Sequence, residues 1–208
     1  MAEEHRHAVV ILARAPELGK VKTRLAAELG DQEALVIYTW LAENTAQVVA
    51  SLPHCDRIVA YTPKDAGVRM RGWLGDGFSF EAQCDGDLGA RMAHGFNRRF
   101  EENADRVLLI GTDAPGISVT ILEEGLAALS HNDVVFGPAL DGGYYAIGLR
   151  ATHTVLFENI SWSATDTLFQ SIAAARRCGL SVQLLPQLSD IDTAQDWRRW
   201  LDTHEARG

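Results

Sequence analysis

The chain has 208 residues, a formal net charge of −9, and a composition that is 47% hydrophobic and 23% charged. Such a length and composition are ordinary for a globular protein with one sizeable core, so we expect a single domain over residues 1–208. The negative charge argues against nucleic acid as a partner, because most of such a surface would repel a duplex.

Cysteine usage and the first apolar run indicate the compartment. Cys55, Cys84 and Cys178 are odd in number and lack Cys-x-x-Cys spacing, which indicates neither a disulfide framework nor a zinc ribbon. The run that ends at Ala13 is too short for a signal sequence or a membrane span. We therefore expect a cytoplasmic protein without a membrane span, and the sequence indicates no particular oligomeric state.

Short apolar runs alternate with segments of helical period in the first two thirds of the chain. Residues 8–13, 57–61, 106–111 and 133–137 are predicted to be strands buried on both faces. Helices are predicted behind the N-cap candidates Asp31 and Ser118, and from Leu88 to Phe100. Repeated strand–helix–strand order predicts a mainly parallel sheet with right-handed crossovers.

The pattern changes after residue 137. Two extended segments, FGPAL and YYAIGL, flank the turn residues 141–143, so we expect the sheet to be mixed. A helix is predicted to start between Ser163 and Asp166, whose spacing resembles a capping box, and to stop at Gly179. The run SVQLLP is predicted to be the last strand, followed by a short helix from Asp192 or Thr193.

A basic loop, RAPELGKVKTRL, follows the first predicted strand. It is not a Walker A motif, because Arg14 occupies the position of the first glycine and Val21 follows Gly19-Lys20 where Ser or Thr is needed. Ligands collect beyond the carboxyl ends of parallel strands, and a basic loop there suits phosphate. The cationic candidates are Arg14, Lys20, Lys22 and Arg24, with Gly19 in the turn. An exposed cationic loop paired with surface acids is the alternative.

Two carboxylates are candidates for a metal site at the same edge. Asp113 in GTDAPGI follows a buried strand, where an unpaired carboxylate is costly, so it needs a partner or caps the local turn. Asp192 belongs to the acidic stretch Asp190–Thr193 before the last helix, where an N-cap role is the alternative. Together Asp113 and Asp192 could share Mg²⁺ (or Mn²⁺) with substrate phosphates.

Glycine-rich segments at 83–92 and 138–145 are candidates for ligand contact. Their glycines allow a ring or a ribose to approach the backbone, and their polar side chains offer hydrogen bonds. A loop before a helix and a plain hairpin turn are the alternatives. Trp162 suits either core packing or a lid over an acceptor. The candidates are Gln83, Gly86, Asp87, Gly89, Asp141, Gly142 and Gly143.

Six motifs occur in order along most of the chain: PELGKVKTRL, GDLGARM, GTDAP, GPALDGGYYAIGL, SWS and DIDTAQDW. This set resembles a family of small bacterial glycosyltransferases, described as radical-SAM/selenodomain-associated transferases and carried as a domain of unknown function. The family looks like a compact branch of the nucleotide-diphospho-sugar transferase superfamily. The resemblance implies a Rossmann-like three-layer α/β/α sandwich with a mainly parallel, mixed sheet, the type A glycosyltransferase fold, which sugar-1-phosphate nucleotidylyltransferases share.

The resemblance also implies roles for residues at the matching positions. Arg14, Lys20, Lys22 and Arg24 would lie on nucleotide phosphates, and Asp113 and Asp192 would bind the metal. Gln83, Gly86, Asp87 and Gly89 would lie near the base and ribose, and Asp141, Gly142, Gly143 and Trp162 near the acceptor. The chain departs from the nucleotidylyltransferase signature at residues 13–16, where those relatives have a glycine-rich loop, and GTDAP offers one acid where many glycosyltransferases have Asp-x-Asp.

Three functions follow, in decreasing order of expectation from the sequence. The first is Mg²⁺-dependent nucleotidyl transfer from an NTP to a phosphorylated small-molecule acceptor, with Lys22 and Asp113 at the reacting phosphates and pyrophosphate released. The second is glycosyl transfer from a nucleotide sugar, in which Asp141 would deprotonate the acceptor hydroxyl. The third is nucleotide binding without catalysis.

Overall fold

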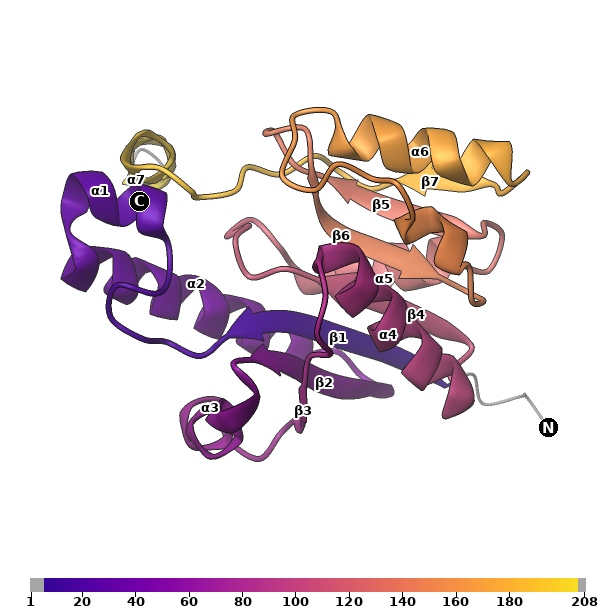
Figure 1. Cartoon of the computed structure of the whole chain (residues 1–208), viewed down its shortest axis with the longest axis horizontal. Helices are drawn as coiled ribbons and strands as arrows, with labels where there is room; N and C mark the ends of the chain where they lie inside the picture. Colours follow the sequence, from indigo (N-terminus) through magenta and orange to yellow (C-terminus); the bar gives the residue numbers. More distant parts are fainter. Residues whose placement is uncertain (1–5, 206–208) are drawn as a thin grey trace.

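The computed structural model describes residues 6–205, and its seven strands form one sheet in the order β3-β2-β1-β4-β6-β5-β7 (Figure 1). The strands are β1 (His7–Arg14), β2 (Cys55–Thr62), β3 (Ser79–Ala82), β4 (Arg106–Ile110), β5 (Val134–Pro138), β6 (Tyr144–Leu149) and β7 (Val182–Leu184). Neighbouring strands are parallel except in the two pairs that β6 forms, with β4 and with β5. The sheet is therefore mainly parallel and mixed, as the sequence predicts.

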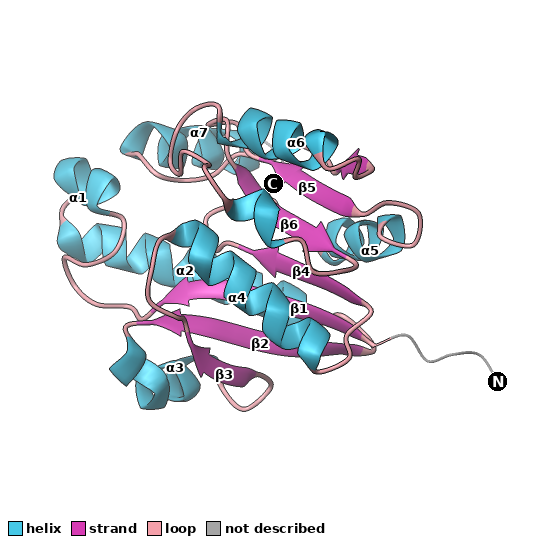
Figure 2. Cartoon of the chain, turned by 45° about the vertical axis from the view of Figure 1, so that its right-hand side comes forward, coloured by secondary structure: helices cyan, strands magenta, loops and turns pink. Residues whose placement is uncertain are grey.

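Helices cover both faces of the sheet, because the central strands are apolar on both sides. The helices are α1 (Thr23–Leu29), α2 (Asp31–Ala50), α3 (Gly67–Leu74), α4 (Leu88–Glu101), α5 (Val119–Ala128), α6 (Thr167–Arg177) and α7 (Ala194–Glu205), with short 3₁₀ turns η1 (Lys64–Ala66) and η2 (Thr154–Phe157). In β1, Val9 and Ile11 pack with α2, α3 and α5, whereas Ala8 and Val10 pack with α4, η2 and α6. Figure 2 shows α4 crossing one face, with α5 on the other. The three-layer α/β/α sandwich is thereby confirmed.

A separate apolar corner joins α1 and α2 to the start of α7. Leu25 of α1, Ile37 and Leu41 of α2, and Ile191 and Ala194 at the start of α7 form one buried cluster. In Figure 1 these three helices gather beyond the carboxyl end of β1. The corner fixes the segment before α7 against the loop that follows β1, although about 170 residues of chain separate them.

Most of the predicted elements are confirmed within a residue or two. Ser118 caps α5 by accepting a hydrogen bond from the Ile121 amide at 3.3 Å. At α2, Gly30 takes the N-cap position and Asp31 is the first helical residue. The pattern missed α1, α3 and β3; β3 has four residues and lies at the sheet edge, so it carries little periodic signal.

The predicted capping box before α6 is wrong. Asp166 is the N-cap residue but forms no side-chain cap bond, and Ser163 has a left-handed backbone with φ of 63°. The hydroxyl of Thr167 organises this loop instead, because it donates to the Ser161 carbonyl at 2.8 Å and accepts from the Ala164 amide at 3.2 Å. The loop therefore curls around Thr167 before the helix begins.

No helix within the described residues is long and apolar enough to cross a bilayer.

Asp133 fastens β5 to β7 and β6 at the amino end of β5. Its Oδ2 accepts from the Ser181 hydroxyl at 2.6 Å and from the Ser181 amide at 2.9 Å, and its Oδ1 pairs with Arg150 at 2.6 Å. The bonds from Ser181, with the Arg150 guanidinium, lower the pKa of Asp133 to about 2. Because this pKa lies below that of an unfolded Asp, the carboxylate stabilises the fold above pH ~4, and the stabilisation is lost as pH falls towards 2.

We therefore expect Asp133→Ala to lower the free energy of unfolding at pH 7 by about 1–2 kcal/mol, the lower part of the range for charged hydrogen bonds, because the site lies at the surface. The deficit should shrink as pH falls from 4 to 2. Urea denaturation across this pH range measures both effects, with the exposed Asp202→Ala as control. A deficit that stays constant down to pH 2 would contradict this role.

Candidate active site

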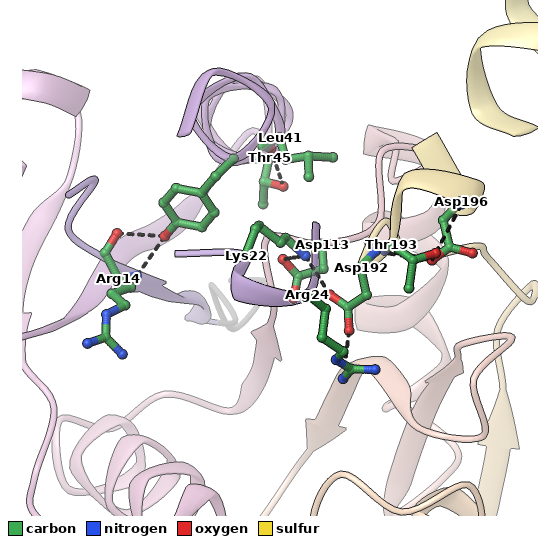
Figure 3. A network of polar contacts seen from close by, with 10 residues as sticks. Arg14, Lys22, Arg24, Leu41, Thr45, Asp113, Asp192, Thr193 and Asp196 are labelled. Carbon is green, nitrogen blue, oxygen red and sulfur yellow. Dashed lines mark hydrogen bonds and ion pairs between the residues drawn. The ribbon is translucent and has the colours of Figure 1, made fainter. Parts of the chain in front are cut away.

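A buried lysine lies at the centre of the candidate site. Lys22 precedes α1 with a left-handed backbone (φ 47°), and its side chain is 6% exposed. Its Nζ lies 2.6 Å from Asp113 Oδ1 and 2.7 Å from Asp192 Oδ1 (Figure 3). Burial by itself lowers the pKa of Lys22, but the two carboxylates outweigh it and leave the pKa raised. The ammonium is therefore charged at neutral pH.

Backbone contacts bring the two carboxylates together. Asp113 follows β4, and its carbonyl accepts from the Ile191 amide at 2.9 Å, which sets the segment before α7 beside it. Thr193 caps the start of α7: its hydroxyl accepts from the Asp196 amide at 3.3 Å, and Asp196 Oδ2 accepts from the Thr193 amide at 2.9 Å. Because Thr193 fills the capping role, the Asp192 carboxylate faces Lys22 and Arg24 instead. The Nη2 atom of Arg24 lies 3.2 Å from Asp192 Oδ2.

A cationic pocket of about 410 Å³ opens on one side of Lys22. Its cationic lining residues are Arg14, Lys20, Lys22, Arg24 and Arg91. Gln83 forms part of its wall, held by a hydrogen bond from its Nε2 to the Ala60 carbonyl at 2.8 Å. Tyr38 fixes the end of β1, because its hydroxyl donates to the Arg14 carbonyl at 2.6 Å and accepts from the Arg14 amide at 2.9 Å. Burial raises the pKa of Tyr38 to about 12, so it stays a neutral hydrogen-bonding group.

An acidic pocket of about 310 Å³ opens on the other side. Its lining includes the carboxylates Asp113, Asp141, Asp190 and Asp192 and the aromatic residues Tyr144, Tyr145 and Trp162. Arg24 is the one cationic side chain among the described residues that line it. Burial, followed by the nearby Asp141 charge, raises the pKa of Asp190 to about 6. Asp113, Asp192, Arg24 and Leu88 line both pockets, so the two cavities adjoin at the Lys22 cluster.

Two glycines shape the acidic pocket by leaving room for its walls. Gly142, with φ of +91°, lies so close to the Thr165 loop that a Cβ would stand 1.8 Å from the Thr165 carbonyl oxygen. At Gly89, in the first turn of α4, a Cβ would meet the Trp162 ring at 2.7 Å. The indole of Trp162 therefore packs on the start of α4 while it lines the pocket.

The structure brings together most of the predicted site residues, but four candidates for nucleotide contact are not among the residues that line the cationic pocket. Asp87 caps α4 by accepting from the Ala90 amide at 2.8 Å, and Gly89 packs against Trp162. Gly86 and Gly19 have positive φ, at 116° and 70°, in the turns before α4 and α1. Each of these four has a local structural role beside the predicted one.

Sequence reasoning missed Arg91 and Tyr38. Arg91 stands one helical turn after Asp87, in the predicted helix that begins at Leu88. A basic residue in the first turns of this helix, next to the candidate Asp87, could have been predicted as a phosphate contact. Tyr38 lies inside α2, and its spacing marks it as a core residue; nothing local indicates that its hydroxyl reaches Arg14.

The donor set at Lys22 fits a divalent cation that is shared with a ligand. No group of three or more His, Cys, Asp or Glu side chains gathers at one point within residues 6–205. Two carboxylates, Asp113 and Asp192, do converge on one cation, the Lys22 ammonium. Mg²⁺ is usually held by one or two carboxylates together with substrate phosphates, so these residues suit a metal that arrives with a nucleotide.

Gly142→Ala is expected to deform the acidic pocket, because the new Cβ overlaps backbone and the positive φ is strained for alanine. We expect the melting temperature to fall by several degrees. Gly72→Ala in α3 is the matched control: no atom lies within 4 Å of its Cβ position, so it should leave the melting temperature unchanged or slightly raised. Equal behaviour of the two variants in a thermal melt would refute the close contact with Thr165.

Solved structures share this fold. A "putative nucleotide-diphospho-sugar transferase" from Desulfovibrio desulfuricans G20 is 35% identical, with a TM-score of 0.90 over 95% of this chain and 87% of that chain. The 4-diphosphocytidyl-2C-methyl-D-erythritol synthase of Anaerococcus prevotii DSM 20548 is 10% identical, with a TM-score of 0.65 over 98% and 97%. Rv0371c of Mycobacterium tuberculosis H37Rv, solved with manganese, is 14% identical, with a TM-score of 0.59 over 94% and 98%.

No curated protein matches the sequence. The model of a family described as "Uncharacterized protein conserved in bacteria (DUF2064)" matches residues 45–164, more than half of the chain. The chain belongs to the DUF2064 family and has the nucleotide-diphospho-sugar transferase fold.

Proposed function

We propose that the protein is a transferase that binds a nucleotide in the cationic pocket and moves a group from it to an acceptor in the acidic pocket. The observation that carries this proposal is the boundary between the pockets: Asp113, Asp192 and Arg24 line both, and the Lys22 ammonium joins the two carboxylates there. A group that leaves a nucleotide in one cavity therefore meets the acceptor beside this cluster. The D. desulfuricans relative, whose description is "putative nucleotide-diphospho-sugar transferase", supports a transferase function.

The cationic pocket suits the phosphates of a nucleoside diphosphate or triphosphate. It gathers five basic side chains against the two carboxylates of Asp113 and Asp192, on a chain whose overall charge is −9. Charge-assisted hydrogen bonds to phosphate contribute about 1.5–3 kcal/mol each, so two or three would give micromolar affinity after ordering costs. Gln83, fixed by the Ala60 carbonyl, offers a polar edge at the wall of the same cavity.

Glycosyl transfer from a nucleotide-diphospho-sugar is the reaction that the geometry supports best. The acceptor oxygen would bond to the sugar carbon, the bond from that carbon to the diphosphate oxygen would break, and the acceptor proton would pass to a base. Asp141 lies in the acidic pocket and forms no ion pair with any described residue. Its Oδ1 accepts from the Gly143 amide at 2.7 Å, which orients the carboxylate and leaves Oδ2 for the proton.

The cations at the boundary would act on the departing diphosphate. Mg²⁺ or Mn²⁺ held by Asp113 and Asp192 would supply positive charge to phosphate oxygens. Lys22 keeps its own charge and holds the two carboxylates in place, and its ammonium would face the phosphates of a nucleotide bound in the cationic pocket. Preorganised charge of this kind is commonly the largest contribution to catalysis.

Nucleotidyl transfer is the second candidate. Five cationic side chains also suit a triphosphate, and the A. prevotii protein of the same fold is a diphosphocytidyl synthase. In that reaction an acceptor phosphate attacks the α-phosphorus, pyrophosphate leaves, and no general base is needed. The phosphate would have to enter the acidic pocket, where Arg24 is the one cation among the described lining residues, so we rank this reaction second.

Lys22→Met is expected to weaken binding of nucleoside diphosphates by about 10- to 100-fold, the loss of one charge-assisted bond. Isothermal titration with UDP, GDP, ADP and CDP in Mg²⁺ measures it. Lys20→Met, which removes an exposed side chain of the same pocket, should weaken binding without loss of stability, and Lys64→Met, outside the pocket, should not. Unchanged affinity in both pocket variants would remove the proposed nucleotide site.

The released product separates the two reactions. With nucleotide sugars or NTPs, Mg²⁺ and a panel of acceptors, we expect nucleoside diphosphate to accumulate rather than pyrophosphate. Asp141→Asn should lower kcat by about 10²- to 10⁴-fold with little change in donor affinity, because it removes the base and keeps the shape. Release of pyrophosphate, with full activity in Asp141→Asn, would favour nucleotidyl transfer instead.

A further inference from the structure

We infer that the acceptor is a non-anionic polyhydroxy compound of about one sugar ring, and that the acidic pocket discriminates against its phosphate esters. The inference rests on the proposed function in one respect, namely that the acidic pocket receives the acceptor. It goes further because it selects among acceptor classes that the reaction type leaves open.

The acidic pocket is lined by more carboxylates than cations. Asp113 and Asp192 are matched by Lys22 and Arg24, with contacts of 2.6 to 3.2 Å. Asp141 and Asp190 line the same cavity, and no described residue forms a salt bridge with either. The cavity therefore presents excess negative charge, which repels an anionic acceptor, leaves an uncharged one unaffected and attracts a cationic one.

The carboxylates of the acidic pocket favour a ligand that brings hydroxyl donors. Carboxylates only accept hydrogen bonds, and so do the carbonyl oxygens of the loops around the pocket. A polyol brings hydroxyl donors that match these acceptors, whereas a phosphate group brings almost none at neutral pH. The Oδ1 atom of Asp141 already accepts from the Gly143 amide, so its Oδ2 is the oxygen that can accept from a hydroxyl group of the ligand.

The size and the aromatic lining of the acidic pocket favour a single sugar ring. Trp162 is half-buried, with its ring packed on Gly89 of α4, and Tyr144 stands on the adjoining wall. Aromatic rings present apolar surface suited to the C–H faces of a sugar ring. At about 310 Å³, the cavity lies at the small end of ligand pockets, roughly 300–1,000 Å³, which suits one ring rather than a long chain.

A metal ion at Asp113 and Asp192 would not reverse this preference. It would arrive with the donor diphosphate, whose own negative charges balance it. The carboxylates of Asp141 and Asp190 would remain uncompensated on the acceptor side.

The test uses matched compounds on the full chain with Mg²⁺ and the nucleoside diphosphate that binds best. Saturation-transfer NMR titrations compare glucose with glucose 6-phosphate, glycerol with glycerol 3-phosphate, and glucose with glucosamine. We expect the neutral member of a phosphate pair to bind at least tenfold more tightly than its phosphate ester, and the cationic glucosamine to bind at least as tightly as glucose. A phosphate ester that binds as well as its parent, an amine that binds more weakly than glucose, or no binding by any neutral compound would each overturn the inference.

Charge removal provides the matched variant. The double variant Asp141→Asn/Asp190→Asn keeps the shape of the pocket and should narrow the preference against phosphate esters at least fivefold, most clearly at low salt. Asp65→Asn/Asp202→Asn removes the same charge from exposed positions outside the pocket and should leave the preference unchanged. Equal preference in the two variants would contradict the electrostatic basis.

The two proposals fail in different ways. Loss of nucleotide binding altogether would remove the proposed function, whatever the polyols do. Tight nucleotide binding together with a preference for phosphate esters would remove only the inference about the acceptor.

Discussion

The site depends on one ammonium group shared by two carboxylates. Lys22 follows β1, Asp113 follows β4, and Asp192 precedes α7, so these ion pairs close a ring through three distant parts of the chain. If the lysine were absent, two carboxylates would face each other in a partly desolvated corner, and removal of one partner from such a cluster typically costs several kcal/mol. The backbone contact from Ile191 to Asp113 and the apolar corner of α1, α2 and α7 position the carboxylates before any ligand enters.

This cluster also divides two environments of opposite charge. On one side the basic residues of the loop after β1 and of α4 surround the cationic pocket; on the other the β5–β6 turn and the loop before α6 surround the acidic one. A small molecule that carries a diphosphate and one that carries hydroxyl groups would therefore each find one preferred cavity. The proposed assignment of the donor to one cavity and of the acceptor to the other rests on this separation of charge.

The sequence predicts the parts of the molecule that repeat regularly and misses those that depend on distant contacts. The buried strands and α2, α4 and α5 follow from apolar periodicity and cap residues. The position of Asp113 after a buried strand predicts either a partner or a turn cap, and Lys22 lies 2.6 Å from its carboxylate. The predicted capping box at Ser163 does not form, because the Thr167 hydroxyl donates to the Ser161 carbonyl and Ser163 has a left-handed backbone. The position of Lys22 after the first predicted strand places it at the carboxyl edge of the sheet. Only the tertiary structure shows that its nearest partners are carboxylates.

The reversed direction of one strand, β6, determines how Asp141 reaches the edge of the sheet where Lys22 lies. Because β6 runs antiparallel to its neighbours, the short turn over residues 139–143 returns at the carboxyl edge of β5 and delivers Asp141 there without a crossover helix. The turn itself is held in place, because a Cβ at Gly142 would stand 1.8 Å from the Thr165 carbonyl oxygen in the loop before α6. The position of Asp141 at this edge therefore depends on that loop as well as on β5 and β6.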